Sequence, residues 1–182
     1  MRKGGGKNKG SQFERDICRQ LSLWLTNGAS DSVFWRTSNS GGRATTRSKK
    51  GKTTENQYGD ICAIEEIGKK FLRLFTVEIK RGYNKHTVQD LFDLEDPSKS
   101  MYASWIEQAK ESARLADTYW MIIIKRDRRQ TVVLHNGADL SKENQSIIFT
   151  SLGFCRLTTL EYFLLSHEED AASMREEANY KG

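Results

Sequence analysis

The sequence has 182 residues, the size of one ordinary domain, and an apolar content of 37% that allows a real core. Its three cysteines are odd in number and far apart, which argues against a disulfide framework or a zinc knuckle and fits a reducing compartment. No stretch reads as a signal peptide, and the longest apolar run, residues 120–124, is too short to span a bilayer. We therefore expect a cytoplasmic protein without membrane contact.

The net charge of +5 is unevenly distributed along the chain. Residues 1–10 carry four basic residues and no acid, and residues 32–54 carry six basic residues and no acid. The last fifteen residues have five acids against two bases. Basic segments of this kind suit a polyanionic partner, because each neutralised phosphate releases counterions. Solvated, flexible segments are the alternative reading.

The first third of the chain predicts an arm, a helix, a strand and a loop. Residues 1–10, rich in Gly and Lys, predict a mobile basic arm. A helix follows, with Ser11 and Glu14 as a capping box, apolar residues at helical spacing from Phe13 to Leu25, and Asn27-Gly28 as its stop. Residues 33–37 predict a short strand. The small, polar and basic residues after it predict a long loop, which inside a compact domain is usually functional or disordered.

The rest of the chain alternates between strands and helices. Residues 59–64 and 71–80 predict two strands, joined by a turn at residues 65–70 into a hairpin. Three further helices are predicted, at residues 87–94, 101–116 and 158–166, and the last of them precedes an acidic tail. Three further strands are predicted, at residues 119–125, 131–135 and 146–150. The order α-β-β-β-α-β indicates the α/β class, with a central mixed sheet of about four to five strands flanked by helices.

The predicted hairpin carries the candidate metal-binding and catalytic residues. Successive side chains of a strand alternate between faces, so Glu78 and Lys80 share a face. Either register of the hairpin places Asp60 on that face too, within roughly 8 Å of Glu78. Carboxylates this close repel each other unless a cation bridges them, and oxygen ligands favour Mg²⁺ or Mn²⁺ over zinc. The alternative is two solvated acids, with Lys80 in a salt bridge to Glu78.

Gly59-Asp60 followed by Glu78-Ile79-Lys80 resembles the PD-(D/E)XK nuclease superfamily, with Tyr58-Gly59 standing where the family name has proline. The stretches KGSQFERDICRQL, VFWRTSNSGGR and GDI resemble the start of archaeal-type Holliday-junction resolvases and related phage nucleases. The likeness covers about residues 7–125. It implies a restriction-endonuclease-like core.

The resemblance also implies a role for each matching residue. Asp60, Glu78 and the carbonyl of Ile79 would hold Mg²⁺, with Mn²⁺ as a substitute, and Lys80 would be the catalytic lysine. Glu14 would match a helix glutamate on the ligand side, although the capping box alone could explain it. The remaining positions are expected near the site or on the DNA backbone: Gln108 beside the catalytic residues, Arg36 and Ser38 flanking the scissile phosphate, and Lys7, Lys9, Arg43, Arg47, Lys49 and Lys50 on other phosphates.

The expected function is that of a Mg²⁺-dependent DNA endonuclease selective for branched DNA, in phage or prokaryotic recombination or repair. The expected organisation is a basic arm at 1–10, a nuclease domain at 11–165 with a basic insert at 37–57, and an acidic tail at 166–182. A homodimer is expected by analogy, and no small-molecule cofactor. Two alternatives stay open: a sequence-specific or defence endonuclease on the same core, and a nuclease-fold DNA-binding protein that no longer cuts.

Overall fold

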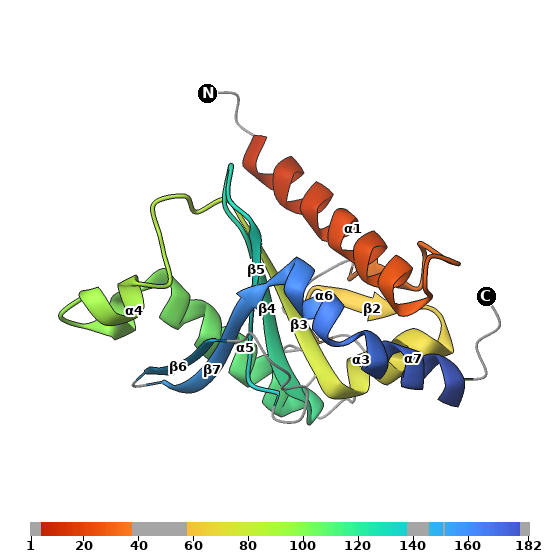
Figure 1. The fold of residues 1–182 in the computed structure, drawn as a ribbon. Helices are drawn as coiled ribbons and strands as arrows, with labels where there is room; N and C mark the ends of the chain where they lie inside the picture. Colours follow the sequence, from red (N-terminus) through yellow and green to blue (C-terminus); the bar gives the residue numbers. More distant parts are fainter. Residues whose placement is uncertain (1–4, 38–57, 138–145, 151, 179–182) are drawn as a thin grey trace, which may run out of the picture.

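The computed structural model describes residues 5–37, 58–137, 146–150 and 152–178. Helices and strands follow one another along these residues, and helices flank a five-stranded sheet (Figure 1). In chain order the elements are α1 (Gly5–Leu25), β1 (Phe34–Arg36), β2 (Ile61–Ala63), α3 (Glu66–Leu74), β3 (Phe75–Arg81), α4 (Asp90–Asp93), the 3₁₀ helix η1 (Pro97–Lys99), α5 (Met101–Ala116), β4 (Tyr119–Lys125), β5 (Thr131–His135), β6 (Ser146–Thr150), β7 (Gly153–Thr159), α6 (Leu160–Ser166) and α7 (Glu168–Glu177).

Five of the strands form one sheet in the order β3-β4-β5-β7-β6. β3 and β4 run parallel, while the other neighbouring pairs are antiparallel. A parallel pair needs a long crossover connection, which the chain supplies through α4, η1 and α5. The sheet is mixed and flanked by helices, which confirms the α/β class and the restriction-endonuclease-like core predicted from the sequence.

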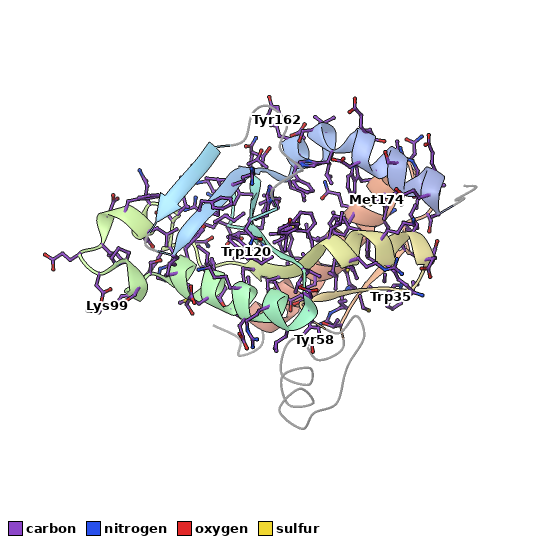
Figure 2. The ribbon with its side chains drawn as sticks, turned by 90° about the horizontal axis from the view of Figure 1, so that it is seen from below. Trp35, Tyr58, Lys99, Trp120, Tyr162 and Met174 are labelled. Atoms are coloured by element: carbon purple, nitrogen blue, oxygen red, sulfur yellow. The ribbon has the colours of Figure 1, made fainter. Side chains whose placement is uncertain are left out.

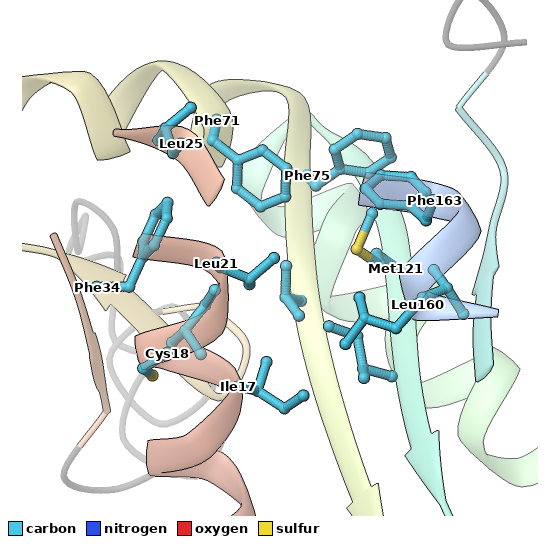
Figure 3. Close-up of a cluster of buried hydrophobic side chains, with 14 of the residues drawn as sticks. Ile17, Cys18, Leu21, Leu25, Phe34, Phe71, Phe75, Met121, Leu160 and Phe163 are labelled. Carbon is cyan, nitrogen blue, oxygen red and sulfur yellow. The ribbon is translucent and has the colours of Figure 1, made fainter. Parts of the chain in front are cut away.

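Alternate side chains of β3 and β4 enter two hydrophobic cores, one on each face of the sheet. On one face, Val77 and Met121 pack with Leu21 of α1 (Figure 3). On the other face, Ile122 packs with Ala109 of α5. Because side chains along a strand alternate, the even-numbered residues of β3 point toward α5.

Helix α1 begins at Gly5, six residues before the predicted start at Ser11. Ser11 lies inside the helix, so the predicted capping box is wrong, and residues 5–10 of the expected arm are helical. Once a helix has nucleated, each further residue adds a hydrogen bond at the cost of ordering only itself, so a helix can continue into a sequence of poor propensity. The predicted stop is confirmed: α1 ends at Leu25, and Asn27 and Gly28 have positive φ angles. Residues 1–4 lie outside the described residues.

Residues 59–80 do not form the predicted hairpin. β2 pairs with β1 in a separate two-stranded ribbon, and α3 fills the connection to β3. Ile67 and Phe71, four residues apart, are both buried on α3, and Gly68 packs closely against Val33 and Phe34. The hairpin prediction is wrong because residues 71–74 alternate like a strand, although their burial follows the helical repeat that starts at Ile67.

The expected acidic tail contains a packed helix, α7. Ala171 is buried, and Met174 packs against the core on the α1 side of the sheet (Figure 2). The Nη1 atom of Arg175 donates to the carbonyls of Trp24 and Leu25 at the end of α1, both at 3.3 Å. Residues 168–177 are therefore part of the folded domain, because a few apolar positions and one arginine attach a mostly acidic segment.

The crossover helix and the central strands lie where the sequence predicts them. α5 covers residues 101–116 and is capped by Ser100, whose side chain accepts a hydrogen bond from the Ala103 N–H. β4 and β5 occupy residues 119–125 and 131–135. Within the described ranges, no helix combines the length and the apolar character needed to cross a lipid bilayer.

Candidate active site

Glu78 and Lys80 lie on the α5 face of β3 and contact each other. The Lys80 Nζ atom donates to Glu78 Oε2 at 2.9 Å and to Gln108 Oε1 at 3.1 Å. Gln108 Nε2 donates to the same Glu78 oxygen at 2.9 Å. The three side chains thus form a closed triangle of hydrogen bonds between β3 and α5. The Glu78 side chain is 1% exposed and that of Lys80 13%, so the two charged groups are largely withdrawn from solvent, whereas Gln108 is exposed.

Asp60 reaches the same strand from its outer edge, without the predicted hairpin. Its N–H donates to the Val77 carbonyl at 2.8 Å, and its Oδ2 atom accepts from the Ile79 N–H at 2.7 Å. Asp60 therefore binds β3 on both sides of Glu78, although β2 itself pairs with β1. The backbone of one residue, and not a strand pairing, brings the two carboxylates together.

The environment of Asp60 opposes its negative charge. Burial, followed by the charge of Glu78, raises the pKa of Asp60 from 3.8 to about 6. The Ile79 N–H and the Lys80 ammonium act in the opposite direction, and they only partly offset the increase. Two buried carboxylates next to each other are costly without a bridging cation.

Gly59 allows Asp60 to approach β3 so closely. Its φ angle is +82°, and a Cβ atom at this position would lie 2.5 Å from the Val77 carbonyl oxygen. Thr37 holds the opposite side of this segment, because its Oγ1 atom donates to the Gly59 carbonyl at 3.0 Å and its N–H to the Asp60 carbonyl at 2.9 Å. No spacing in the sequence links Thr37 to Asp60, so the sequence alone does not predict this contact.

Ser112 is a second residue at the site without a functional role in the sequence-based predictions. Its Oγ atom lies 3.4 Å from Glu78 Oε1. Ser112 follows Gln108 by four residues, so both face β3 from one side of α5. That spacing is a signal from which Ser112 could have been found.

Glu14 and Arg36 pair with each other beside the site. The Arg36 Nε atom donates to Glu14 Oε2 at 2.8 Å, which connects α1 to the end of β1. Glu14 lies close enough for its charge to raise the pKa of Asp60, as the smallest of the contributions. The structure does not bring its carboxylate into the group formed by Glu78, Lys80 and Gln108.

The other predicted residues lie on the surface or outside the described residues. Lys9 is exposed on α1. The structure does not describe the side chain of Lys7 or any part of five more positions: Ser38, Arg43, Arg47, Lys49 and Lys50. Their predicted contacts to DNA stay predictions.

The donors at this site fit a hard divalent cation. Asp60 and Glu78 offer carboxylate oxygens, and the Ile79 carbonyl lies on the same edge of β3 as its N–H, the edge that Asp60 occupies. In the part of the chain that the structure describes, no group of three or more His, Cys, Asp or Glu side chains could hold a metal ion. The set is therefore two carboxylates and a backbone oxygen, which suits Mg²⁺ or Mn²⁺ bound together with water or substrate oxygens.

Comparison with known proteins places the chain in a family. The profile of a family described as "phage putative PDDEXK endonuclease" matches residues 5–165, a span that includes every residue of the site. No curated protein and no solved structure matches the chain. The match confirms the resemblance to the PD-(D/E)XK superfamily: the chain belongs to this family of phage PDDEXK endonucleases, and its chemistry is that of a nuclease.

Proposed function

We propose that this protein is a divalent-metal-dependent DNA endonuclease that hydrolyses phosphodiester bonds at Asp60, Glu78 and Lys80. The observation that supports it is the buried pair of carboxylates beside one lysine, at the edge of β3. Such a pair destabilises the fold unless the two carboxylates bind a cation. Both carboxylates lie within the residues that match the nuclease family.

Each residue of the site takes one role in this proposal. Asp60, Glu78 and the Ile79 carbonyl would hold Mg²⁺, or Mn²⁺ in its place. The ion supplies positive charge against the charge that builds up on the scissile phosphate, and it makes water a better nucleophile. Lys80 orients the attacking water and stabilises negative charge next to it. Gln108 is a positioning residue, because it hydrogen-bonds both Glu78 and Lys80 and fixes the distance between them.

Arg36 and the basic segments contact the DNA backbone in this proposal. The guanidinium of Arg36 is held at its Nε atom by Glu14, and its outer nitrogens, which bond to no other described residue, would bind a phosphate. In this proposal Glu14 positions the guanidinium of Arg36. The alternative is that Glu14 becomes a further metal ligand when DNA is bound. Ser38, Lys7, Lys9 and the basic residues between 43 and 50 would add phosphate contacts that do not read sequence.

We further propose that the substrate is branched DNA, such as a four-way junction of phage recombination or repair, cut by a homodimer. The support is the resemblance of residues 7–125 to junction resolvases and related phage nucleases. Cleavage of a four-way junction, a linear duplex and a single strand of equal length tests this substrate class. Equal rates on the junction and the duplex would contradict structure selectivity and leave the endonuclease proposal intact.

The central test uses isosteric substitutions that keep the shape of the site and remove its charge. Asp60→Asn and Glu78→Gln should each reduce cleavage in Mg²⁺ by a factor of about 100 or more, because each removes a carboxylate from the metal site. DNA affinity in Ca²⁺ should stay within a few-fold of wild type. Glu66→Gln, on the exposed surface of α3, is the matched control and should cut normally. Wild-type rates in either site variant would refute the assignment.

A further inference from the structure

A hollow lined with arginines lies at the turn between β4 and β5, outside the candidate active site. It measures about 370 Å³. Ile124 and Val132, which are register partners on β4 and β5, contribute its apolar side. The polar lining consists of Arg126, Arg128, Arg129 and Gln130. The chain thus places three guanidinium groups around one hollow in a turn of five residues.

Within the described residues, no carboxylate compensates the charge of these arginines. Among the described residues, none of the three forms an ion pair with a carboxylate. The acid within the turn, Asp127, is held elsewhere: its carboxylate pairs with Arg81 at 2.8 Å and accepts from Asn84 at 2.8 Å. The hydrogen bond from Asn84, followed by the charges of Arg81 and Lys9, lowers the pKa of Asp127. Asp127 therefore anchors the turn and does not neutralise the hollow.

The backbone of the turn is held in place. The Asp127 N–H donates to Asn84 Oδ1 at 2.8 Å, and Arg126 Nη1 donates to the His86 carbonyl at 3.2 Å. Arg128 has a φ of +58°, a left-handed conformation that Asn or Gly would adopt more readily. An arginine at a position that favours Asn or Gly, in a turn held by the loop after β3, indicates that its side chain is useful there.

The hollow lies on the same face of the sheet as the candidate active site. Lys80 and Ile124 are register partners on the parallel strands β3 and β4, so their side chains share a face. The hollow therefore begins about one strand spacing, roughly 5 Å, from Lys80. The turn extends beyond the end of β3, toward the beginning of α1 (Figure 1). Its tip lies roughly 10 Å past Lys80 along the strand direction, given a rise of about 3.3 Å per residue.

We propose that this hollow binds the phosphodiester backbone of the nucleic acid about three nucleotides away from the scissile phosphate. The proposal rests on the nuclease function proposed above and adds a second contact to the same substrate. Successive phosphates along one strand of duplex DNA rise by about 3.4 Å, so roughly 10 Å corresponds to three of them. Guanidinium forks match phosphate oxygens in geometry and charge. With an apolar side and Gln130 as the one side-chain acceptor among its lining residues, the hollow binds the backbone without reading bases.

The test removes two of the charges without straining the turn. In Arg128→Asn/Arg129→Gln the first substitution suits the positive φ angle, and the second keeps the length of the chain. Arg73→Gln/Arg114→Gln is the matched control: it removes two exposed arginines that lie before the opposite ends of β3 and β4. Binding to a labelled duplex is measured in Ca²⁺ over a series of KCl concentrations, and thermal unfolding verifies that both variants are folded.

The hollow variant should bind DNA about 10- to 100-fold more weakly than wild type at low salt, and its log–log salt slope should fall by about two. The control should stay within about three-fold. Duplexes that end at the scissile phosphate on the side of the hollow should bind the wild type and the variant equally well. Affinity and slope equal to those of the control would overturn the inference.

Two further results keep this inference separate from the proposed function. Mg²⁺-dependent cleavage by the wild type tests the function alone, whatever the hollow variant does in Ca²⁺. Inorganic phosphate, added at constant ionic strength, tests whether the hollow is a small-anion site. If phosphate raises the melting temperature of the wild type and not of the variant, while both bind DNA equally well, the hollow holds free anions and the inference fails.

Discussion

At the scale of a single residue, Asp60 lowers the stability of the metal-free fold because its carboxylate is buried at the candidate active site. It is 6% exposed, its neighbour is another buried acid, and its pKa is raised to about 6. The folded protein therefore binds more protons than the unfolded chain between about pH 4 and pH 6. In that window the stability of the metal-free protein falls as the pH rises, because Asp60 must become charged in a poorly solvated place.

This linkage predicts that Asp60→Asn stabilises the protein that it inactivates. At pH 7.5 in EDTA the variant should be more stable than wild type by about 1–3 kcal/mol, while near pH 3.5 the two should coincide. Thermal unfolding at the two pH values measures the difference. Asp31→Asn, at an exposed position, is the control and should show no such pH dependence. Equal melting temperatures at pH 7.5 would mean that Asp60 carries no charge penalty.

Some residues of the site could be predicted from the sequence because their signals are local. Glu78 and Lys80 differ by two positions at the end of an apolar strand, and Gln108 borders an apolar helical stripe. The sequence could not predict the pair formed by Glu14 and Arg36, because it joins two elements that are 22 residues apart. The same holds for Thr37, whose contacts depend on where the segment before β2 crosses the edge of β3.

At the scale of elements, Ser22 joins α1 to β1. Its Oγ atom donates to the Cys18 carbonyl at 2.7 Å and accepts from the Phe34 N–H at 3.0 Å, and the residue is fully buried. Phe34 begins β1, which ends at Arg36, so this bond also helps to fix the position of Arg36 beside the site. A single hydroxyl thus aligns a helix with a strand.

Ser22→Ala should destabilise the fold by about 1–3 kcal/mol, because it leaves the buried N–H of Phe34 without its acceptor. Urea unfolding at pH 7.5 measures the change. Ser173→Ala, on the exposed surface of α7, removes a bond to a carbonyl of its own helix and should cost well under 1 kcal/mol. A free energy of unfolding unchanged in Ser22→Ala would contradict the role given to this hydroxyl.

The elements that the sequence predicts well are those with one clear period. α5, β4 and β5 have long apolar patterns and match their predicted ranges. α3 has only nine residues, and short apolar segments fit both helical and strand periods. The sequence does not predict β7, because its buried positions, Cys155 and Thr158, are three residues apart and do not follow the alternation of a strand.

At the scale of the whole molecule, the two sides of the sheet have separate tasks. The α5 side holds Glu78, Lys80 and the arginine-lined hollow. The α1 side holds the larger core, to which α6 contributes Leu160 and Phe163 (Figure 3). Ala171 of α7 is buried in the same core. The chemistry therefore uses one face of strands whose other face supports the larger core, and β3 and β4 contribute side chains to both faces.

This division predicts that removing residues 168–182 weakens the fold and spares the reaction. The truncated protein loses the contacts of α7 with α1 and α3, and its melting temperature should fall by roughly 5–10 °C. Cleavage at 15 °C should stay within about three-fold of the full chain, since α7 packs on the side opposite α5. Removal of residues 179–182 alone serves as the control. Loss of cleavage in a truncated protein that is still folded would show that α7 takes part in catalysis.

Gly59 stands at the proline position of the motif, which limits how well the motif alone can identify or guide the redesign of such enzymes. Proline keeps φ near −65°, whereas this backbone turns the other way before Asp60. Restoring the proline of the family name would therefore push the first acid off the edge of the sheet. In this protein the position of the Asp60 carboxylate at the edge of β3 is what defines the site. A glycine with a positive φ angle, in place of the proline of the motif, produces that position.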